Sequence, residues 1–362
     1  MRVFVILVVI LVMVASAAAG YLWYSIEKPF GHIPREGIFV EIPHGSSQRT
    51  AARILSESGI IRSPLAFELY ARRQPKRSLQ AGEYFFDHPL TTKEVFGKLA
   101  KGEVFEQLFT VHEGDTIFDI ASNLEGAKYM RATDFLAAAT DASQIQDMAP
   151  GAKTLEGFLF PATYNLPHRF TASDLTGVMV RKFRDALEQI APDRLDPLTP
   201  GTPLLSVVTL ASLVEAETPK PDERPLVAGV YTNRLHKEML LQCDPSVIYA
   251  LKQVNNYNPP LTLKNLRYDS PYNTYVHPGL PPGPIGNPGE ASLKAALNPA
   301  PTDYLFFVSN TQGGHFFAST LAEHNKNVAK YHRLLNGEPA DAPVTEEVHQ
   351  THSVSHAHKG KR

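Results

Sequence analysis

The sequence has a single cysteine, Cys243, among 362 residues. One cysteine excludes an intramolecular disulfide and any zinc site built on several cysteines. The chain also lacks a charge excess, because 35 Lys and Arg stand against 37 Asp and Glu, a formal net charge of -2. Without a basic field, nucleic-acid binding is not expected. The 43% apolar content excludes a disordered polyelectrolyte, and the length allows two or three domains of about 100 to 200 residues.

Long apolar runs are scarce too, with one exception at the N-terminus. Residues 3–24 carry no charge, and at about 1.5 Å per residue they form about 33 Å of helix, enough to span a bilayer core of about 30 Å. Tyr21, Trp23 and Tyr24 lie at the far end, where aromatic rings favour the headgroup region. We predict a transmembrane anchor over residues 1–24. The alternative is a signal peptide cleaved near the small residues inside the run.

The charge before the anchor predicts its orientation. Arg2 precedes the apolar run, which favours a cytoplasmic N-terminus, and no second run of this length follows. We therefore expect a single-pass protein of a bacterial inner (cytoplasmic) membrane. The rest of the chain would then face the periplasm or the cell wall.

Hydrophobic periodicity and turn residues divide the remainder into segments, and they predict an α+β fold class. The expected segments are a linker (25–37), a small α/β unit (38–105), a second or connecting unit (106–150), a larger α+β unit (151–336) and a disordered His-rich tail (337–362). The first unit is expected to contain strands over 38–42 and 82–86 and helices over 48–58, 64–72 and 93–101.

The openings of the first two units repeat each other. In both, a strand ends in a Gly turn, a hydroxyl residue follows, and a helix with an apolar stripe begins. Gly45 aligns with Gly114, and Ser47 aligns with Thr116. Two such copies resemble LysM modules, small folds that bind glycans containing N-acetylglucosamine. The alternative is a common arrangement of strand, turn and helix that binds nothing.

A helix that is apolar on nearly every side is predicted early in the larger unit. The run L-L-S-V-V-T-L-A-S-L-V-E-A-E-T-P follows Pro203 and ends at Thr218, because the residue before a proline is disfavoured in a helix. Such a helix belongs in a domain core. Its last turn holds Glu215 and Glu217, where burial and the negative helix end both favour a protonated carboxyl. A carboxyl that stays protonated near neutral pH suits a general acid.

The two carboxylates are not equivalent. The helix face beneath Glu217 carries the bulkier apolar residues, but periodicity alone leaves both Glu217 and Glu215 open as the candidate acid. The alternative is that one or both form ordinary ion pairs with Arg224 or Arg234. Spacing along the sequence does not decide between these possibilities.

Aromatic and polar side chains gather farther along the chain, before a stretch dense in Pro and Gly over residues 279–289. This stretch is expected to be stiff and to lie on the surface, as the wall of a groove. Tyrosine faces and side-chain amides are groups through which sugars bind. The candidate substrate-binding residues are Gln242, Asp244, Tyr272, Asn273 and Tyr275. The alternative is a packed tyrosine cluster with satisfied hydroxyls.

Six motifs occur in the order found in the MltG (YceG-like) family of endolytic murein transglycosylases, which the chain resembles up to about Tyr331. They are L-E-G-F-L-F-P-A-T-Y, A-S-L-V-E-A-E-T, L-Q-C-D-P-S-V-I-Y, S-P-Y-N-T-Y, G-L-P-P-G-P-I and G-G-H-F-F-A-S-T-L-A-E-H-N. The resemblance implies a lysozyme-like catalytic domain with one essential Glu in the second motif. We map that Glu to Glu217, because E-T resembles the E-S that follows the acid in lysozyme-like transglycosylases, and keep Glu215 as second choice.

Three positions depart from the family pattern. Ala162 stands where an Asp is usual, Ala216 replaces a frequent Lys, and Cys243 stands where Thr or Ser is expected. The first departure removes any carboxylate role at position 162. Cys243 is expected to be a small buried residue and no nucleophile.

The resemblance also implies a reaction and its partners. The substrate would be peptidoglycan glycan strands, cut at the β-1,4 bond between N-acetylmuramic acid and N-acetylglucosamine to leave 1,6-anhydromuramic acid ends. Glu217 would serve as acid and then base, with Asp244 and Glu156 as helpers. This chemistry requires no metal and no cofactor. Work beside peptidoglycan synthases, terminating nascent strands, would follow from the family.

Two other classes of function fit the same residues. The first is a muramidase-type hydrolase, in which Asp244 or Asp269 assists a water molecule and the product has a reducing end. The second is a membrane-tethered scaffold that binds glycans through LysM-like units without catalysis. In that case Glu217 would belong to a core ion pair.

Overall fold

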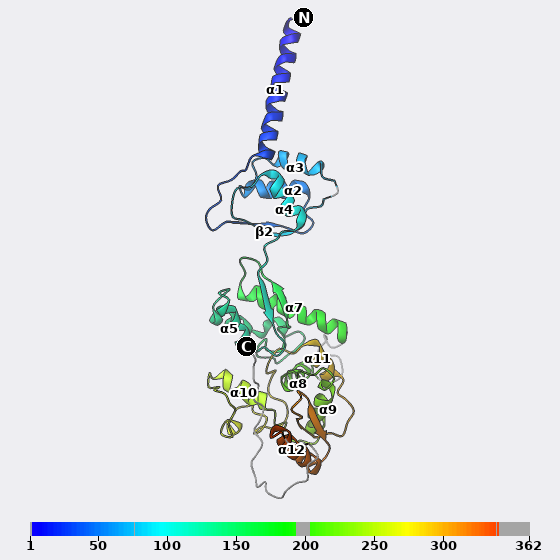
Figure 1. The fold of residues 1–362 in the computed structure, drawn as a ribbon. Helices are drawn as coiled ribbons and strands as arrows, with labels where there is room; N and C mark the ends of the chain where they lie inside the picture. Colours follow the sequence, from blue (N-terminus) through cyan, green and yellow to red (C-terminus); the bar gives the residue numbers. More distant parts are fainter. Residues whose placement is uncertain (1, 76, 193–202, 338, 340–362) are drawn as a thin grey trace. The chain divides into compact units, whose positions relative to one another are not determined.

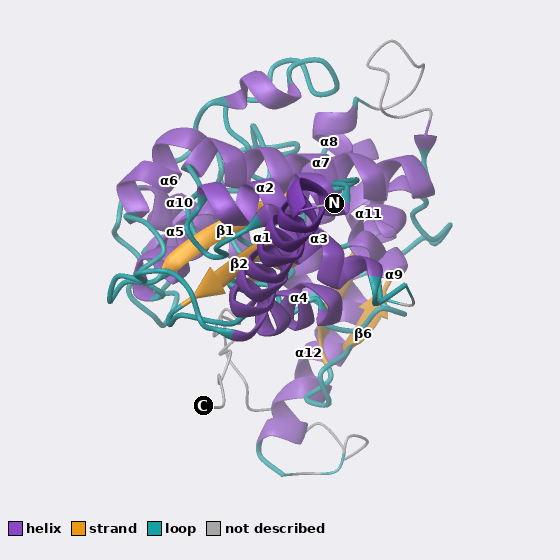
Figure 2. Cartoon of the chain, turned by 90° about the horizontal axis from the view of Figure 1, so that it is seen from above, coloured by secondary structure: helices purple, strands orange, loops and turns teal. Residues whose placement is uncertain are grey.

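The computed structural model describes residues 2–75, 77–192, 203–337 and 339. It confirms the α+β class, since helices dominate and the strands form short pairs (Figure 2). The chain forms two compact units, one of residues 1–108 and 165–170 and one of residues 109–164 and 171–362. The predicted tail lies almost wholly outside the described residues.

The N-terminal helix α1 (Arg2–Glu27) is the long apolar helix that the sequence predicts (Figure 1). Among the described residues it is the one helix long and apolar enough to cross a membrane. Its end packs on the first unit, because Ser25 is buried and its carbonyl accepts a hydrogen bond from Thr92 Oγ1 at 2.8 Å. The Arg62 guanidinium lies 4.8 Å from the Tyr24 ring centre. The helix thus continues past residue 25, where the sequence predicts a linker.

The rest of the first unit contains the five predicted elements. They are β1 (Ile38–Ile42), α2 (Gln48–Glu57), α3 (Pro64–Arg72), β2 (Gly82–Phe86) and α4 (Thr92–Lys101). β1 and β2 pair antiparallel, with Ile38 opposite Phe86 and Ile42 opposite Gly82. Alternate strand residues such as Val40 and Tyr84 face the three helices, and together they close the core.

The second unit is larger and mostly helical. Its elements are β3 (Leu108–Val111), α5 (Ile117–Gly126), α6 (Ala132–Ala139), η1 (Ala142–Ile145), β4 (Ala162–Asn165), α7 (Ala172–Ile190), α8 (Leu204–Glu217), α9 (Arg224–His236), α10 (Asp244–Gln253), η3 (Asn265–Arg267), α11 (Glu290–Leu297), β5 (Phe306–Ser309), β6 (His315–Ala318) and α12 (Leu321–Leu335). β3 pairs with β4, and β5 pairs with β6. The terminal residues Leu108 and Asn165 of the first pair are counted with the first unit.

The repeated opening that the sequence predicts is present in both places. Gly45 and Gly114 have φ values of 77° and 83°, a region that favours glycine and that turns the chain after β1 and after β3. Ser47 accepts a hydrogen bond from the Thr50 N–H at the start of α2. Thr116 does the same at the start of α5, where Asp119 completes a capping box. The two copies are therefore alike over a few residues, because each has a glycine turn followed by a hydroxyl residue that caps a helix.

Helix α8 is the core helix of the second unit, as its uniform apolarity predicts. Every residue from Val207 to Val214 is buried, and α8 packs against α9, α10 and α11. Its neighbours cover it on all sides because it has no polar face to present to water. Its last turn, which holds the two carboxylates, reaches a polar environment.

Candidate active site at the end of helix α8

Glu215 lies in a buried ion pair. Its Oε1 accepts a hydrogen bond from Arg224 Nη2 at 2.6 Å, and its Oε2 accepts one from the Gly289 N–H at 2.9 Å. The side chains of Glu215 and Arg224 are 5% and 6% exposed. Arg224 also reaches Glu113 at 3.3 Å. Glu215 therefore joins α8 to α9 and to the loop before α11, which is the ion-pair alternative considered for it from the sequence.

The same contacts limit the chemistry open to Glu215. Burial raises the pKa of Glu215, while the Gly289 N–H and the Arg224 guanidinium act to lower it. Whatever its protonation state, both oxygens face donors that the fold holds in place. A general acid must direct its proton at a substrate, and geometry is the first requirement for that role.

Glu217 has a different environment, although it ends the same helix. Its Oε1 accepts a hydrogen bond at 2.7 Å from the hydroxyl of Tyr231, a neutral donor on α9. Burial raises the pKa of Tyr231 well above its usual value, and Cys243 and Glu217 raise it further, so the hydroxyl keeps its proton and remains a donor. Glu217 itself is only partly buried. It is the carboxylate that is both oriented and accessible.

Cys243 lies beside this pair as the N-terminal cap residue of α10. It is fully buried, as the sequence predicts. Burial raises the pKa of the Cys243 thiol well above its usual range, and the nearby Glu217 raises it further. A thiol in this state is a poor nucleophile and acts as packing beside Glu217.

The Pro- and Gly-rich stretch does not lie on the surface as the sequence predicts. Residues 283–289 are buried. A Cβ at Gly286 would lie 2.7 Å from the Gly114 carbonyl oxygen, and one at Gly157 would lie 2.5 Å from Pro284. Because these glycines have no side chain, the backbone segments can pack closely against each other. The expectation of an exposed groove wall was wrong for this part of the loop.

A second buried carboxyl, Glu156, holds the turn before α5. It is 1% exposed, and its oxygens accept hydrogen bonds from the Ile117 N–H, from Tyr249 Oη at 3.0 Å and from Asn287 Nδ2 at 3.2 Å. Burial raises the pKa of Glu156 to about 8, against the lowering effect of the Ile117 N–H and the Tyr249 hydroxyl. These contacts give Glu156 a role in holding the fold.

The structure brings Asp244 and Tyr275 together. The Tyr275 hydroxyl donates to Asp244 Oδ1 at 2.5 Å, and both side chains are half-buried at the start of α10. Gln242 is exposed, and its Oε1 accepts a hydrogen bond from Arg234 Nη1 at 3.3 Å. Arg234, the other cation considered for the carboxylates, also donates to main-chain carbonyls. Three of the predicted residues thus lie around the start of α10, next to Cys243.

The other two predicted residues differ in accessibility. Tyr272 is half-buried and its ring centre lies 5.0 Å from that of Tyr249. Asn273 is fully buried, and its Nδ2 donates to the carbonyls of Leu266 and Tyr268. An amide used in this way shapes the loop and does not face a ligand.

Two further groups beside the site escaped prediction from the sequence. Glu223 accepts hydrogen bonds from the Thr218 hydroxyl at 3.3 Å and the His315 N–H at 3.0 Å, and it pairs with the His315 ring at 2.7 Å. Tyr231 is the other group. Their positions along the chain give no signal of contact with Glu217 or Thr218, although the G-G-H motif around His315 stands out as a pattern.

Metal ligands do not gather in the described ranges. No group of three or more His, Cys, Asp or Glu side chains in that part of the chain has the arrangement of a metal site.

A model of the YceG-like family matches residues 40–330, which is most of the chain. The chain belongs to the YceG-like family. This confirms the resemblance that the six motifs indicate. The match includes the first unit from β1 onward as well as the α8 site.

Relatives and a solved structure agree with this assignment. The chain is 33% identical over 323 residues to an endolytic murein transglycosylase of Bacillus subtilis (strain 168), covering 85% of this chain and 88% of the relative. It is 29% identical over 349 residues to one of Streptococcus pneumoniae (strain D39), of which it spans 63%. A crystal structure of a yceG-like protein from Listeria monocytogenes is similar, with 33% identity, a TM-score of 0.51 and coverage of 81% of this chain and 99% of that chain.

Proposed function

We propose that this chain is an endolytic lytic transglycosylase of peptidoglycan with Glu217 as its acid and base. The names of its relatives support the activity. The observation that carries the residue assignment is the contrast within α8: fixed donors hold both oxygens of Glu215, whereas Glu217 is partly exposed and oriented by Tyr231. The bond cut would be the β-1,4 link from N-acetylmuramic acid to N-acetylglucosamine.

The proposed reaction needs one carboxyl group. The Glu217 carboxylic acid gives its proton to the glycosidic oxygen, and the bond from that oxygen to muramic acid C1 breaks. The C6 hydroxyl of the same sugar attacks C1, and its proton goes to the Glu217 carboxylate. The product is a 1,6-anhydro ring, and the acid is restored. Because the nucleophile is part of the substrate, no second carboxylate has to activate water.

The remaining site residues fit roles in substrate binding. Asp244, Tyr275 and Gln242 surround the start of α10 beside Cys243, and the Tyr272 ring lies near Tyr249 in the middle of the same helix. We assign the glycan to this surface. We also assign a lysozyme-like organisation to the second unit and a LysM-like role to the repeated openings. Anchoring by α1 would hold the enzyme at the inner membrane, facing the wall beside peptidoglycan synthases.

The test is the product mixture released from purified peptidoglycan by the full chain in detergent, analysed by mass spectrometry. The wild type is expected to release fragments that end in 1,6-anhydromuramic acid. Glu217→Gln is expected to lower the rate by a factor on the order of 10³, the usual contribution of a general acid. Glu215→Gln is the matched control on the same helix.

The control carries its own expectation. Glu215→Gln leaves Arg224 without its buried partner and is expected to lower the free energy of unfolding by about 3 kcal/mol, while folded molecules still release anhydro ends. Reducing ends from the wild type would contradict the transglycosylase and favour a hydrolase. Loss of turnover in folded Glu215→Gln, with turnover kept in Glu217→Gln, would reverse the assignment.

A further inference from the structure

A second feature of the same unit lies at the other end of α10. A cavity of about 420 Å³ is lined by Phe118 and Asp119 of α5, by Lys252 and Gln253 of α10, and by Asn255 and Tyr257 of the following loop. This volume falls in the range of about 300 to 1,000 Å³ that is typical of ligand pockets. The pocket residues come from two segments far apart in the sequence. None of the six is a site residue predicted from the sequence.

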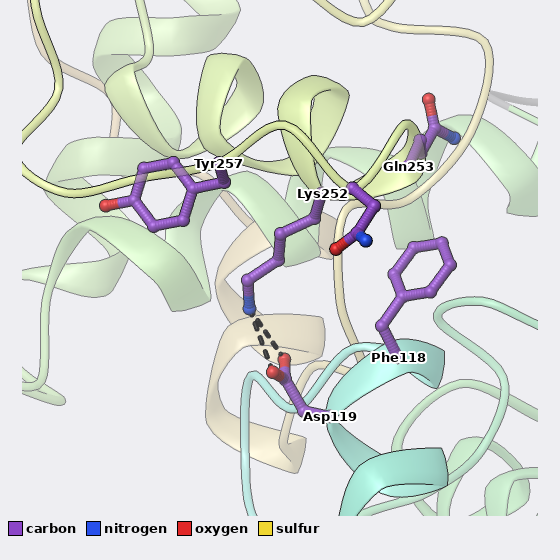
Figure 3. A pocket seen from close by; sticks show the side chains of 6 residues that line it. Phe118, Asp119, Lys252, Gln253 and Tyr257 are labelled. Carbon is purple, nitrogen blue, oxygen red and sulfur yellow. Dashed lines mark hydrogen bonds and ion pairs between the residues drawn. The ribbon is translucent and has the colours of Figure 1, made fainter.

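The chemistry of the pocket is aromatic at the sides and polar at the base. In Figure 3 the rings of Phe118 and Tyr257 lie on either side of an ion pair between Lys252 and Asp119. Lys252 Nζ lies 2.9 Å and 3.0 Å from the two carboxylate oxygens of Asp119. Gln253 and Asn255 also line the pocket, and their side-chain amides can donate and accept hydrogen bonds.

The ion pair decides which class of ligand suits the pocket. The two side chains are 30% and 37% exposed, so they contact solvent while neutralising each other. Although burial acts to raise it, hydrogen bonds from Thr116 and Lys252 lower the pKa of Asp119, which keeps the pair ionised. A strongly anionic ligand such as a phosphate would have to displace Asp119 from Lys252. A neutral ligand with hydroxyl and amide groups and an apolar ring face meets no such cost.

The pocket is connected to the candidate active site by aromatic side chains along α10. Tyr275 contacts Asp244 at the start of the helix, the ring centre of Tyr272 lies 5.0 Å from that of Tyr249 in the middle of the helix, and the Tyr249 ring centre lies 6.0 Å from that of Phe118. From Cys243 to Lys252 the helix covers about 13 Å at about 1.5 Å per residue. The pocket is therefore too far from Glu217 to hold the sugars at the scissile bond.

We propose that this pocket is a distal glycan subsite that holds one N-acetylated sugar of the strand, away from the bond that is cut. The inference rests on the proposed function. A distal subsite increases the affinity of the enzyme for long strands, because sugars beyond the reacting pair add binding contacts. The pocket would thus favour cleavage inside strands over cleavage of short oligosaccharides.

The experiment compares the full chain in detergent on long glycan strands without peptides and on tetrasaccharides cut from them. Tyr257→Ala removes one wall of the pocket, and Phe118→Leu removes the other ring while keeping an apolar side chain near Tyr249. Tyr268→Ala, a tyrosine in the same region but outside the pocket lining, is the matched control. Thermal unfolding of each variant separates folding defects from binding defects.

For both pocket variants we expect KM on long strands to rise about tenfold relative to KM on tetrasaccharides, a factor that corresponds to about 1.4 kcal/mol. Tyr268→Ala is expected to keep the wild-type ratio. An unchanged ratio in folded Tyr257→Ala and Phe118→Leu would overturn the subsite. If the wild type cleaves neither substrate, the proposed function fails, and that outcome is distinct from failure of the subsite.

Discussion

Tyr231 decides how Glu217 is presented. Its hydroxyl is the donor to Glu217 Oε1 at 2.7 Å, and its ring lies against Phe307 with centres 5.9 Å apart. Removing only the hydroxyl therefore leaves the packing in place. It also removes the hydrogen bond that orients the Glu217 carboxyl group.

We predict that Tyr231→Phe lowers kcat by about tenfold to a hundredfold, because the acid is no longer held in one orientation. KM is expected to change little, because the surface assigned to the glycan is unaltered. Tyr164→Phe is the control, since Tyr164 also donates a hydroxyl hydrogen bond, to the Phe160 carbonyl, in the same unit. A kcat equal to that of the wild type would argue against positioning by Tyr231.

Glu156 makes stability depend on pH. Its carboxyl has an ordinary value of 4.5 in the unfolded chain, and burial raises its pKa to about 8 in the folded protein. Between these values the folded state binds a proton that the unfolded chain does not. The free energy of unfolding therefore falls as pH rises through this window.

The neutral side chain of Glu156→Gln resembles the protonated carboxyl group, so this variant lacks the pH dependence of stability that Glu156 causes. We expect the wild type to lose on the order of 3 kcal/mol more than Glu156→Gln as pH rises across the window. Urea denaturation at a series of pH values measures both proteins. Parallel curves would mean that Glu156 is ionised in the folded state.

At the level of elements, the packing of the loop before α11 requires glycine, which has no side chain. Gly286 passes so close to the Gly114 carbonyl that a Cβ would lie 2.7 Å from its oxygen. We predict that Gly286→Ala lowers the free energy of unfolding by about 2 kcal/mol, because the backbone segments must separate. Gly126→Ala at the end of α5 is the control, since nothing lies within 4 Å of its added Cβ. Equal stability of the two variants in denaturation would contradict this packing argument.

These elements also show why the groove wall was mispredicted. Pro and Gly are frequent in exposed turns, and residues 279–289 match that pattern. Here the glycines permit contact with the turn at Gly114 and with Gly157, which are distant in sequence. The Pro and Gly content of a segment predicts that its backbone is irregular, whereas contacts with the rest of the fold decide whether the segment is exposed.

For the whole molecule, α1 is long and apolar enough to anchor the chain in a membrane. Its apolar surface, from Val3 to Val14, is exposed with no protein to cover it. We predict that the full chain stays in the membrane pellet after washing with alkaline carbonate, because about 20 apolar residues suffice for a stable span. A variant without residues 2–20 is expected in the supernatant. The mass of the N-terminal peptide from cells distinguishes an anchor from a cleaved signal, and release of the full chain would contradict anchoring.

Features that depend on local pattern could be predicted from residue order alone. The apolar run of α1, the repeated Gly turns with their hydroxyl caps, and the uniformly apolar α8 with two carboxylates at its end all follow from residue order. The ordered motifs also indicated the family. These predictions held because periodicity and capping act over a few residues, a range that the sequence shows directly.

The partners of the two carboxylates, in contrast, depend on how the helices pack in three dimensions. Arg224 and Gly289 lie at the side of α8 that Glu215 faces, and Tyr231 lies at the side that Glu217 faces. The pocket at Lys252 likewise exists because α5 and the end of α10 meet in the fold. Long-range contacts depend on how the helices pack, and helix packing is set by the whole core, so no local pattern in the sequence records it.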